Sequence, residues 1–331
     1  MQGKIEFGTQ KAFDMAVKMY KSRTENYYKN DVLFEPEEIF IQEDLSLYIP
    51  RLVKQVYGKS FRNTSALLEY VVQFGVSGEM DIWQLEEGKI LHFKHLEPSS
   101  DKAAVRSYIK GKTLANQKGK ELEAIKALDK AIEKYDRHAQ AYERRGKVNF
   151  ILKKYHDALR DYNKALALDP NNPYAYFGKA MVMLQEKNKE EAVNSFQTAI
   201  AKSVALQNIH WEARRLKGKT HVELKQFDKA EFELKLFTKR KFPEESPSFL
   251  WNRQGHILFG KTLMGLEKFN EAVEQFAAAL EIEKGNDKTP KAMMLRLLGV
   301  AKKTAGQNGF IKDLKDASEL GDKVATELLK S

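Results

Sequence analysis

The chain has 331 residues, of which 42% are hydrophobic, and its 19 Gly and 8 Pro exclude a collagen-like or wholly disordered chain. The net charge of +10 is uneven: residues 1–100 carry 12 Lys and Arg against 15 Asp and Glu, a net charge of −3, whereas residues 101–331 carry 44 against 31, a net charge of +13. The absence of cysteine excludes disulfides, cysteine-ligated zinc and thiol nucleophiles.

The N-terminus lacks the apolar segment of a signal peptide, and no stretch approaches the about 18 uncharged apolar residues of a membrane span. We therefore expect a cytoplasmic protein without a membrane span; a signal peptide removed by trimming is the alternative. The basic second part suits acidic peptide, nucleic acid or anionic lipid, or it is simply a solvated, lysine-rich helical surface.

Residues 1–100 predict a small α+β domain of unknown role. Apolar residues at helical spacing predict a helix over residues 9–28. The segment 37–57 is ambiguous, because residues 39–41 resemble a strand whereas the apolar residues of 45–56 are spaced as in a helix interrupted at Pro50.

Further along, Asn63–Ser65 offer N-caps for a helix that runs to Phe74. Two short strands are then predicted, Met80–Leu85 and Lys89–His95, joined by a turn over residues 86–88. A lone hairpin is marginal in water, so we expect it to pack on the helices or to pair with a strand from the 30s of the sequence. The segment 97–101 is the predicted junction, with Ser100 or Asp101 capping the next helix.

From residue 101 onward, small and aromatic residues recur at a fixed spacing. Gly146 is followed by Ala158, Tyr162, Ala165 and Pro170. This spacing is that of the tetratricopeptide repeat, and the segment resembles that family. The first small position recurs in further units at Gly111, Ala180, Gly218, Gly260 and Gly299.

The resemblance implies a mainly α fold, a right-handed α-α superhelix over residues 101–331, preceded by the small α+β domain. About five to six helical hairpins are expected, because one repeat cannot bury its apolar face alone and must stack on its neighbours. The last unit begins near Pro290 and resembles a Sel1-type or terminal capping unit. Its last helix is expected at Lys312–Leu329.

In this family the first helix of each repeat lines the concave face, so the resemblance implies a partner-binding groove there. Its inward positions carry a row of lysines together with interleaved aromatic and basic side chains. The row is Lys112, Lys147, Lys219 and Lys261, and the interleaved residues are Tyr108, Phe150, Tyr174, Phe177, Arg215 and Arg296. Such a surface suits an extended or helical peptide with acidic groups and apolar anchors. Alternatively, these lysines only solvate the helices.

No catalytic, cofactor or metal site is predicted. Gly255–Thr262 matches the phosphate-binding loop pattern, but it lies inside a predicted helix, where the backbone N–H donors are already used. The Gly-Lys-Thr triplet recurs at Gly111 and Gly218, so it belongs to the repeat. His92 and His95 are three residues apart in a predicted strand and therefore point to opposite faces.

The favoured interpretation is a non-enzymatic scaffold that binds a protein or peptide partner in the basic groove. The alternative is a nucleic-acid-binding protein that uses the basic C-terminal part, although the paired base-reading positions of RNA-binding repeats are absent. An enzyme with its site in residues 1–100 is the third candidate, and no motif there supports it. Partner identity and oligomeric state stay open.

Overall fold

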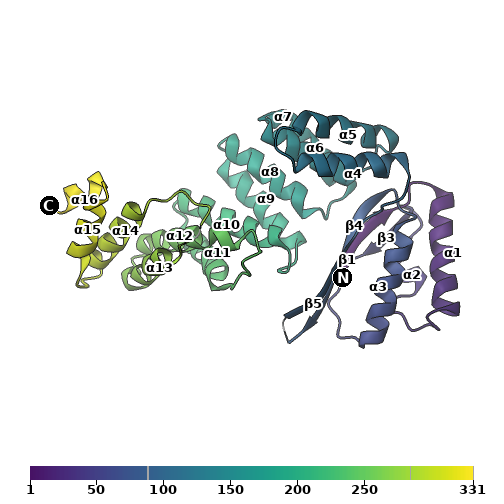
Figure 1. Ribbon diagram of the computed structural model, residues 1–331, viewed down its shortest axis with the longest axis horizontal. Coiled ribbons are helices and arrows are strands. Elements are labelled where there is room, and N and C mark those ends of the chain that lie inside the picture. Colours follow the sequence, from purple (N-terminus) through teal and green to yellow (C-terminus); the bar gives the residue numbers. More distant parts are fainter. Residues whose placement is uncertain (88, 284, 331) are drawn as a thin grey trace. The chain divides into compact units, whose positions relative to one another are not determined.

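The computed structural model describes residues 1–87, 89–283 and 285–330. Contacts divide the chain into two compact units, Met1–Pro170 and Asn171–Ser331, each with apolar cores of its own. The first unit begins with a sheet and continues in helices, whereas the described part of the second is helical (Figure 1). Within the described residues no helix is long and apolar enough to cross a membrane.

The first unit opens with a five-stranded antiparallel sheet in the order β2-β3-β1-β4-β5. Its strands are β1 (Gln2–Glu6), β2 (Phe40–Ile41), β3 (Ser46–Ile49), β4 (Ser77–Glu86) and β5 (Lys89–Leu96). One face is covered by the helices α1 (Gln10–Asn26), α2 (Pro36–Ile39) and α3 (Gly58–Val72) (Figure 1). Ile5, Leu47 and Met80 point to this side and form the core with α1 and α3. Alternation places Glu79 and Asp81 of β4, like the charged residues of β1, on the opposite face, here called the free face because α1–α3 do not cover it.

The predicted helix over residues 9–28 and the two predicted strands are confirmed as α1, β4 and β5. The ambiguous segment 37–57 contains α2, β2 and β3, so a helix over residues 45–56 is wrong. Residues 46–49 instead pair with β1 in the middle of the sheet. Pairing of the β4–β5 hairpin with a strand from the 30s is also wrong, because β4 pairs with β1. The sequence pattern did not indicate β1, which is short and whose pairing partners lie far along the chain.

The predicted N-caps Asn63–Ser65 are also wrong, because these residues lie inside α3. The Asn63 side chain donates to the backbone oxygen of Asp31 at 2.8 Å, and the Thr64 hydroxyl accepts from the Leu33 N–H at 2.8 Å. Their polar groups therefore hold the loop that precedes α2. Residues that favour caps are used here for tertiary contacts, and sequence alone does not distinguish the two roles.

The secondary structure changes between Leu96 and the start of α4 (Ala103–Ala115): strands and helices precede this segment, and helices follow it. The N-cap residue of α4 is Lys102, so the predicted cap at Ser100 or Asp101 is wrong. The Lys102 ammonium donates to the backbone oxygen of Gly75 at 3.1 Å and ties this junction to the segment after α3. The domain boundary at residue 100 stays a prediction, since the first compact unit runs on to Pro170.

Consecutive helices pair into six helical hairpins among the described residues, which confirms the expected repeat architecture. The first unit continues with α4, α5 (Glu121–Lys134), α6 (Ala139–Ile151) and α7 (Tyr155–Leu168). The second unit contains α8 (Pro173–Gln185), α9 (Lys189–Lys202), α10 (Asn208–Glu223), α11 (Phe227–Lys239), a 3-10 turn (Phe249–Trp251), α12 (Asn252–Gly265), α13 (Phe269–Glu281) and α14 (Lys291–Thr304).

The recurrent small residues mark where the two helices of a hairpin touch. A Cβ atom on Gly260 of α12 would lie 2.5 Å from a ring carbon of Phe276 on α13. On Gly146 of α6 it would lie 3.0 Å from the Tyr162 ring on α7. Glycine is required at these positions by close approach rather than by an unusual backbone angle. The sequence spacing thus reports a physical contact inside each hairpin.

The expected last helix, Lys312–Leu329, is wrong in one respect: it is two helices, α15 (Phe310–Glu319) and α16 (Lys323–Leu328). Gly321 interrupts them with φ of 90°, which favours glycine. The Asp322 side chain then accepts from the Ala325 N–H at 3.0 Å and caps α16. The Sel1-type character of this terminal unit stays a prediction.

Candidate functional site

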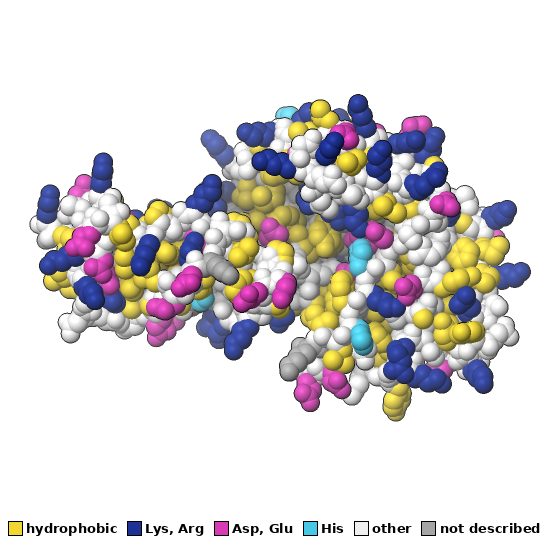
Figure 2. Space-filling model, in the orientation of Figure 1, with side chains coloured by type: hydrophobic (Ala, Val, Ile, Leu, Met, Phe, Trp, Pro, Cys, Tyr) yellow, Lys and Arg dark blue, Asp and Glu magenta, His cyan; other side chains and the backbone are white. Residues whose placement is uncertain are grey.

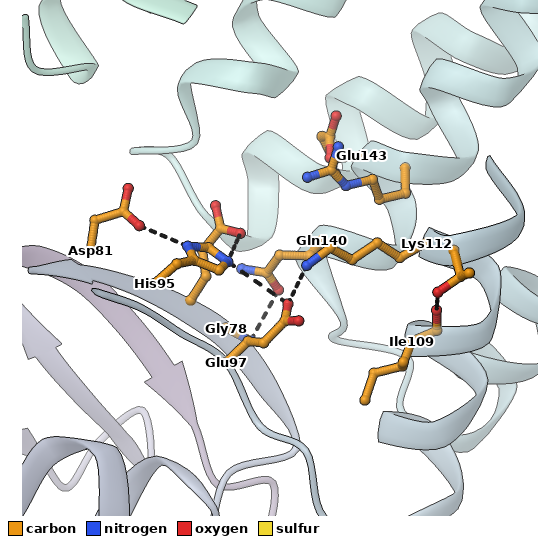
Figure 3. A network of polar contacts seen from close by, with 11 residues as sticks. Gly78, Asp81, His95, Glu97, Ile109, Lys112, Gln140 and Glu143 are labelled. Atoms are coloured by element: carbon orange, nitrogen blue, oxygen red, sulfur yellow. Dashed lines mark hydrogen bonds and ion pairs between the residues drawn. The ribbon is translucent and has the colours of Figure 1, made fainter. Parts of the chain in front are cut away.

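A chain of charged groups joins the free face of the sheet to the first repeat (Figure 3). His95 of β5 lies between carboxylates, with Nδ1 2.7 Å from Asp81 Oδ1 and Nε2 3.9 Å from Glu97 Oε2. Lys112 of α4 donates to the same Glu97 oxygen at 2.6 Å. We call these four residues the junction cluster. Its charges alternate in sign, so each group stabilises the ionised form of the next.

The pKa values follow from these contacts. Hydrogen bonds to Asp81 and then to Glu97 raise the pKa of His95 to about 10, so the ring holds both protons at neutral pH. The hydrogen bond from His95, helped by Lys112, lowers the pKa of Glu97 to about 2 despite partial burial. A permanently protonated imidazole cannot accept a proton as a general base near neutral pH.

Two further carboxylates, those of Glu79 and Glu143, lie beside this cluster. Glu79 of β4 is 3.9 Å from His95 Nε2, and burial raises its pKa, an effect that Arg144 partly offsets. On α6, Arg144 Nε is 3.2 Å from Glu143 Oε2. Among the residues that the structure describes, no three His, Asp or Glu side chains are placed to hold a metal ion.

Two further hydrogen bonds reinforce the same junction. The Gly78 N–H of β4 donates to the Gln140 side-chain oxygen of α6 at 3.1 Å, and both groups are buried. The Tyr135 hydroxyl, at the end of α5, donates to Glu6 Oε2 of β1 at 2.7 Å. The free face of the sheet therefore packs against α4–α6 through specific polar contacts, and this arrangement explains why sheet and first repeats form one unit.

The predicted groove residues of the first unit have three different environments. Tyr108 is buried, with its ring 4.6 Å from that of His138, and Lys112 is held by Glu97. Lys147 is exposed on α6. Phe150 is half-buried, and its ring lies 5.6 Å from that of Tyr155. Tyr108 and Lys112 thus contact other residues of the first unit, and Lys147 is the predicted cation of this unit that is exposed.

In the second unit, the predicted residue Arg215 of α10 is buried. Its guanidinium lies 4.3 Å from the centre of the Trp251 ring and donates a hydrogen bond to Gln254 of α12. Burial lowers the pKa of Arg215 to about 10. Lys219, one turn further along α10, is more exposed and lies 3.9 Å from Glu223.

Lys261 of α12 and Arg296 of α14 lie close together. Burial lowers the pKa of the Lys261 ammonium, and the positive charge of Arg296 lowers it further. Arg296 Nε is paired with Asp322 Oδ2 at 2.9 Å. Within residues 171–283 and 285–330, Lys261 has no ion-pair partner. The positive charges of Lys261 on α12 and Arg296 on α14 therefore repel each other, and only Arg296 is paired with a carboxylate.

Tyr174 and Phe177 complete the predicted set on α8. Both are half-buried, and the Phe177 ring lies 5.5 Å from that of Phe196 on α9. The structure thus brings Lys261 and Arg296 close together and buries Arg215. The side chains of Tyr174 and Phe177 stay partly accessible. The role of all ten residues in binding stays a prediction.

Sequence reasoning missed three members of the junction cluster: Asp81, His95 and Glu97. The hairpin turn alone would pair Asp81 with Lys94, because Glu86 pairs with Lys89 and Leu85 with Ile90. An irregularity between Gln84 and Leu85 shifts the register by one residue, so Asp81 instead opposes His95. No local sequence signal marks that shift.

The segment Gly255–Thr262, which matches the phosphate-loop pattern, lies wholly within α12. It neither follows a strand nor opens a helix, so its backbone N–H groups are bonded within the helix. This agrees with the assignment of its Gly-Lys-Thr to the repeat.

Two family models, both described as "tetratricopeptide repeat", match residues 139–172 and 161–194. A TPR repeat-containing protein of Methanocaldococcus jannaschii is 25% identical over 205 residues, which cover 60% of this chain. The chain spans 34% of the length of that curated relative.

Solved structures show the same helical-hairpin fold. YrrB, described as a TPR protein with an unusual peptide-binding site, is 23% identical with a TM-score of 0.53, over 62% of this chain and 98% of that one. PilF of Pseudomonas aeruginosa is 16% identical with a TM-score of 0.54, over 70% of this chain and 97% of that one. The matched repeats, the repeat-containing relative and the shared fold agree with the glycine contacts inside the hairpins: residues 139–194 match tetratricopeptide repeats, and the chain has the helical-hairpin fold of such proteins.

Proposed function

We propose that this protein is a non-catalytic scaffold that binds an acidic segment of a partner protein on the first helices of its second unit. The binding surface, here named the basic face, consists of Lys219, Lys261 and Arg296 with the aromatic side chains Tyr174 and Phe177. Lysine and arginine would pair with the partner's carboxylates, and the aromatic rings would contact its apolar side chains.

The observation that carries this proposal is the environment of Lys261. Its ammonium is half-buried, lies near a second cation, and lacks an ion-pair partner among residues 171–283 and 285–330. An uncompensated, partly desolvated charge costs free energy, and an incoming carboxylate would remove that cost. The peptide-binding site of YrrB, as that protein is described, is consistent with a peptide ligand on this fold.

The test compares wild type with the double variant Lys219→Glu/Lys261→Glu. Partners captured from cell extract are identified by mass spectrometry, and the affinity of each is then measured with purified proteins by fluorescence anisotropy. We expect at least about a tenfold loss of affinity in the variant, because two attractive charge pairs become repulsive.

The matched control is Lys235→Glu/Lys239→Glu, which makes the same change of charge on exposed positions of α11. It should bind as wild type does. Equal losses in both variants would mean that only net charge matters, and no loss in either would show that the basic face does not bind the partner.

The positive charge of residues 101–331 favours nucleic acid as the second candidate ligand. Affinity for single-stranded RNA or DNA would fall steeply with salt, with a slope set by the number of phosphates neutralised. A peptide held partly by apolar contacts would lose less affinity between about 50 and 200 mM salt. Binding of a 20-nucleotide probe with the steep slope, together with loss of that binding in the charge-reversal variant, would favour this alternative.

We assign a structural role to the junction cluster in place of a catalytic one. Its histidine stays protonated because carboxylates surround it, and Lys112 is occupied by Glu97. Each group is therefore paired within the chain and is not poised to exchange a proton with a substrate.

A further inference from the structure

The sheet of the first unit ends differently at its two edges. At one edge, β2 contains only two residues, Phe40 and Ile41, and is too short to pair with another strand. At the other, β5 contains eight residues, and no described strand lies beyond it. A long edge strand presents a row of backbone N–H and C=O groups to any extended chain, and proteins normally shorten, cover or charge such an edge.

β5 also exposes unusually many apolar side chains. Phe93 is 53% exposed, and Leu91 and Ile90 are each 47% exposed. Phe93 stacks on Trp83 of β4, with ring centres 5.6 Å apart, so the two rings form one apolar surface. Figure 2 shows hydrophobic side chains gathered at the surface over the β4–β5 hairpin. An exposed apolar cluster of this kind marks a surface that another polypeptide covers.

The charges of β5 indicate what would cover it. The strand itself contains no carboxylate. His95 is already paired with Asp81 and Glu97, whereas Lys94 shares only an exposed ion pair with Glu69, so His92 and Lys94 are the side chains that can meet a further carboxylate. Alternation places Leu91 and Phe93 toward the free face of the sheet, and His92 and Lys94 toward the helices. Residues directly opposite in an antiparallel pair interact most strongly. A complementary strand would therefore alternate apolar residues with acidic ones.

We propose that β5 is a strand-addition site that binds an extended segment of a partner protein, in which apolar and acidic residues alternate. The partner's backbone would hydrogen-bond to the outer edge of β5. Its apolar side chains would lie opposite Leu91 and Phe93, and its carboxylates opposite His92 and Lys94. A second copy of this chain fits poorly, because a second β5 strand contains no carboxylate that could lie opposite His92 and Lys94.

The test uses the full chain and a fluorescent ten-residue peptide of alternating valine and glutamate as the probe. A control peptide carries proline at its two central valines, since proline cannot donate to a strand ladder and disrupts pairing. We expect the alternating peptide to bind and the proline peptide to bind at least about tenfold more weakly. Hydrogen exchange of the β5 amides should slow when the alternating peptide is present.

The protein variant Leu91→Ser/Phe93→Ser removes the apolar contacts while leaving the backbone edge intact. Its matched control is Phe232→Ser/Leu236→Ser, at exposed apolar positions of α11. The first variant should weaken binding about tenfold and the control should not, with circular dichroism confirming that both are folded. The variant Lys219→Glu/Lys261→Glu should bind this probe normally, which separates β5 from the basic face.

Three outcomes would overturn the proposal. The proline peptide could bind as well as the alternating one, or the Leu91→Ser/Phe93→Ser variant could retain full affinity. Sedimentation could instead show that the wild type is a dimer that the same variant dissociates, in which case a second copy occupies β5.

Discussion

Glu97 and His95 hold opposite charges over most of the accessible pH range, because each stabilises the ionised form of the other. The pKa of Glu97 is lowered to about 2, so its contribution to stability is complete above its ordinary pKa of about 4.3 and is lost as the pH falls toward 2. The pKa of His95 is raised to about 10, so its contribution is complete below about pH 6.5 and is lost as the pH rises toward 10. Both residues therefore contribute fully to stability only between about pH 4.3 and pH 6.5.

The variant Glu97→Gln tests this coupling. Without the carboxylate, the pKa of His95 should fall, although the hydrogen bond to Asp81 keeps it above its ordinary value. We expect a loss of about 1 kcal/mol in the free energy of unfolding at pH 6, a value reduced by screening because His95 is one-third exposed. Denaturant unfolding and an NMR titration of His95 measure the two effects.

The control for that variant is Glu69→Gln, which breaks the exposed pair with Lys94 and should change stability by less than about 0.5 kcal/mol. An unchanged pKa of His95 in Glu97→Gln would show that the two groups are not coupled. The sequence pointed to Lys112 as a functional position, but its partner, Glu97, became visible only in the structure, since neither residue carries a local signal for the other.

Inside each helical hairpin, the turn contains at least one residue in the left-handed backbone conformation. The first and last hairpins use glycine there, Gly119 with φ of 86° and Gly306 with φ of 67°. The four hairpins between them use other residues, namely Lys153, Lys187, Lys225 and Glu267, with φ between 56° and 62°. Side chains with a Cβ atom are strained in this region, so these turns store a small, removable strain.

Replacing Lys225 by glycine should therefore stabilise the second unit. The relief of strain exceeds the added entropy of the unfolded chain, and we expect a gain of about 0.5 kcal/mol in the free energy of unfolding. Lys225 is exposed, so no packing is lost. Denaturant unfolding compares it with Lys229→Gly, an exposed position inside α11, which should lose about 1 kcal/mol. A loss in both variants would contradict the strain argument.

At the scale of the whole molecule, the composition break near residue 100 does not coincide with the division between the two compact units, which falls after Pro170. The sheet and the first two hairpins belong to one compact unit, held by contacts such as Gly78–Gln140, Glu6–Tyr135 and Glu97–Lys112. Cutting the chain at residue 100 would leave buried polar groups of the sheet without partners, and such groups are costly.

We therefore expect residues 1–170 to unfold in a single cooperative transition. The free energy of unfolding of residues 1–100 should be lower by about 3 kcal/mol, because each of the three lost contacts contributes about 1 kcal/mol. A chain of residues 1–136 keeps Tyr135 but lacks Gln140 and should lie between them. Thermal and denaturant unfolding of the three chains measure the difference. Equal stability of residues 1–100 and 1–170 would instead support two independent domains.

The sequence by itself determined the repeats, because the contacts that define them are local. Gly146 meets Tyr162, and Gly260 meets Phe276, within one hairpin, so a fixed spacing of small and aromatic residues encodes each pair. Helical periodicity likewise located α1. These features need no knowledge of distant parts of the chain.

Only the tertiary structure decided the rest. β1 was invisible because its strand partners, Ser46–Ile49 and Ser77–Glu86, are remote in sequence. The junction of Asp81 with His95 depends on a one-residue register shift, and the tie to Lys112 depends on how the sheet meets α4. Long-range pairing carries no periodic signature, since its free energy arises from groups that fold into contact only after the local elements have formed.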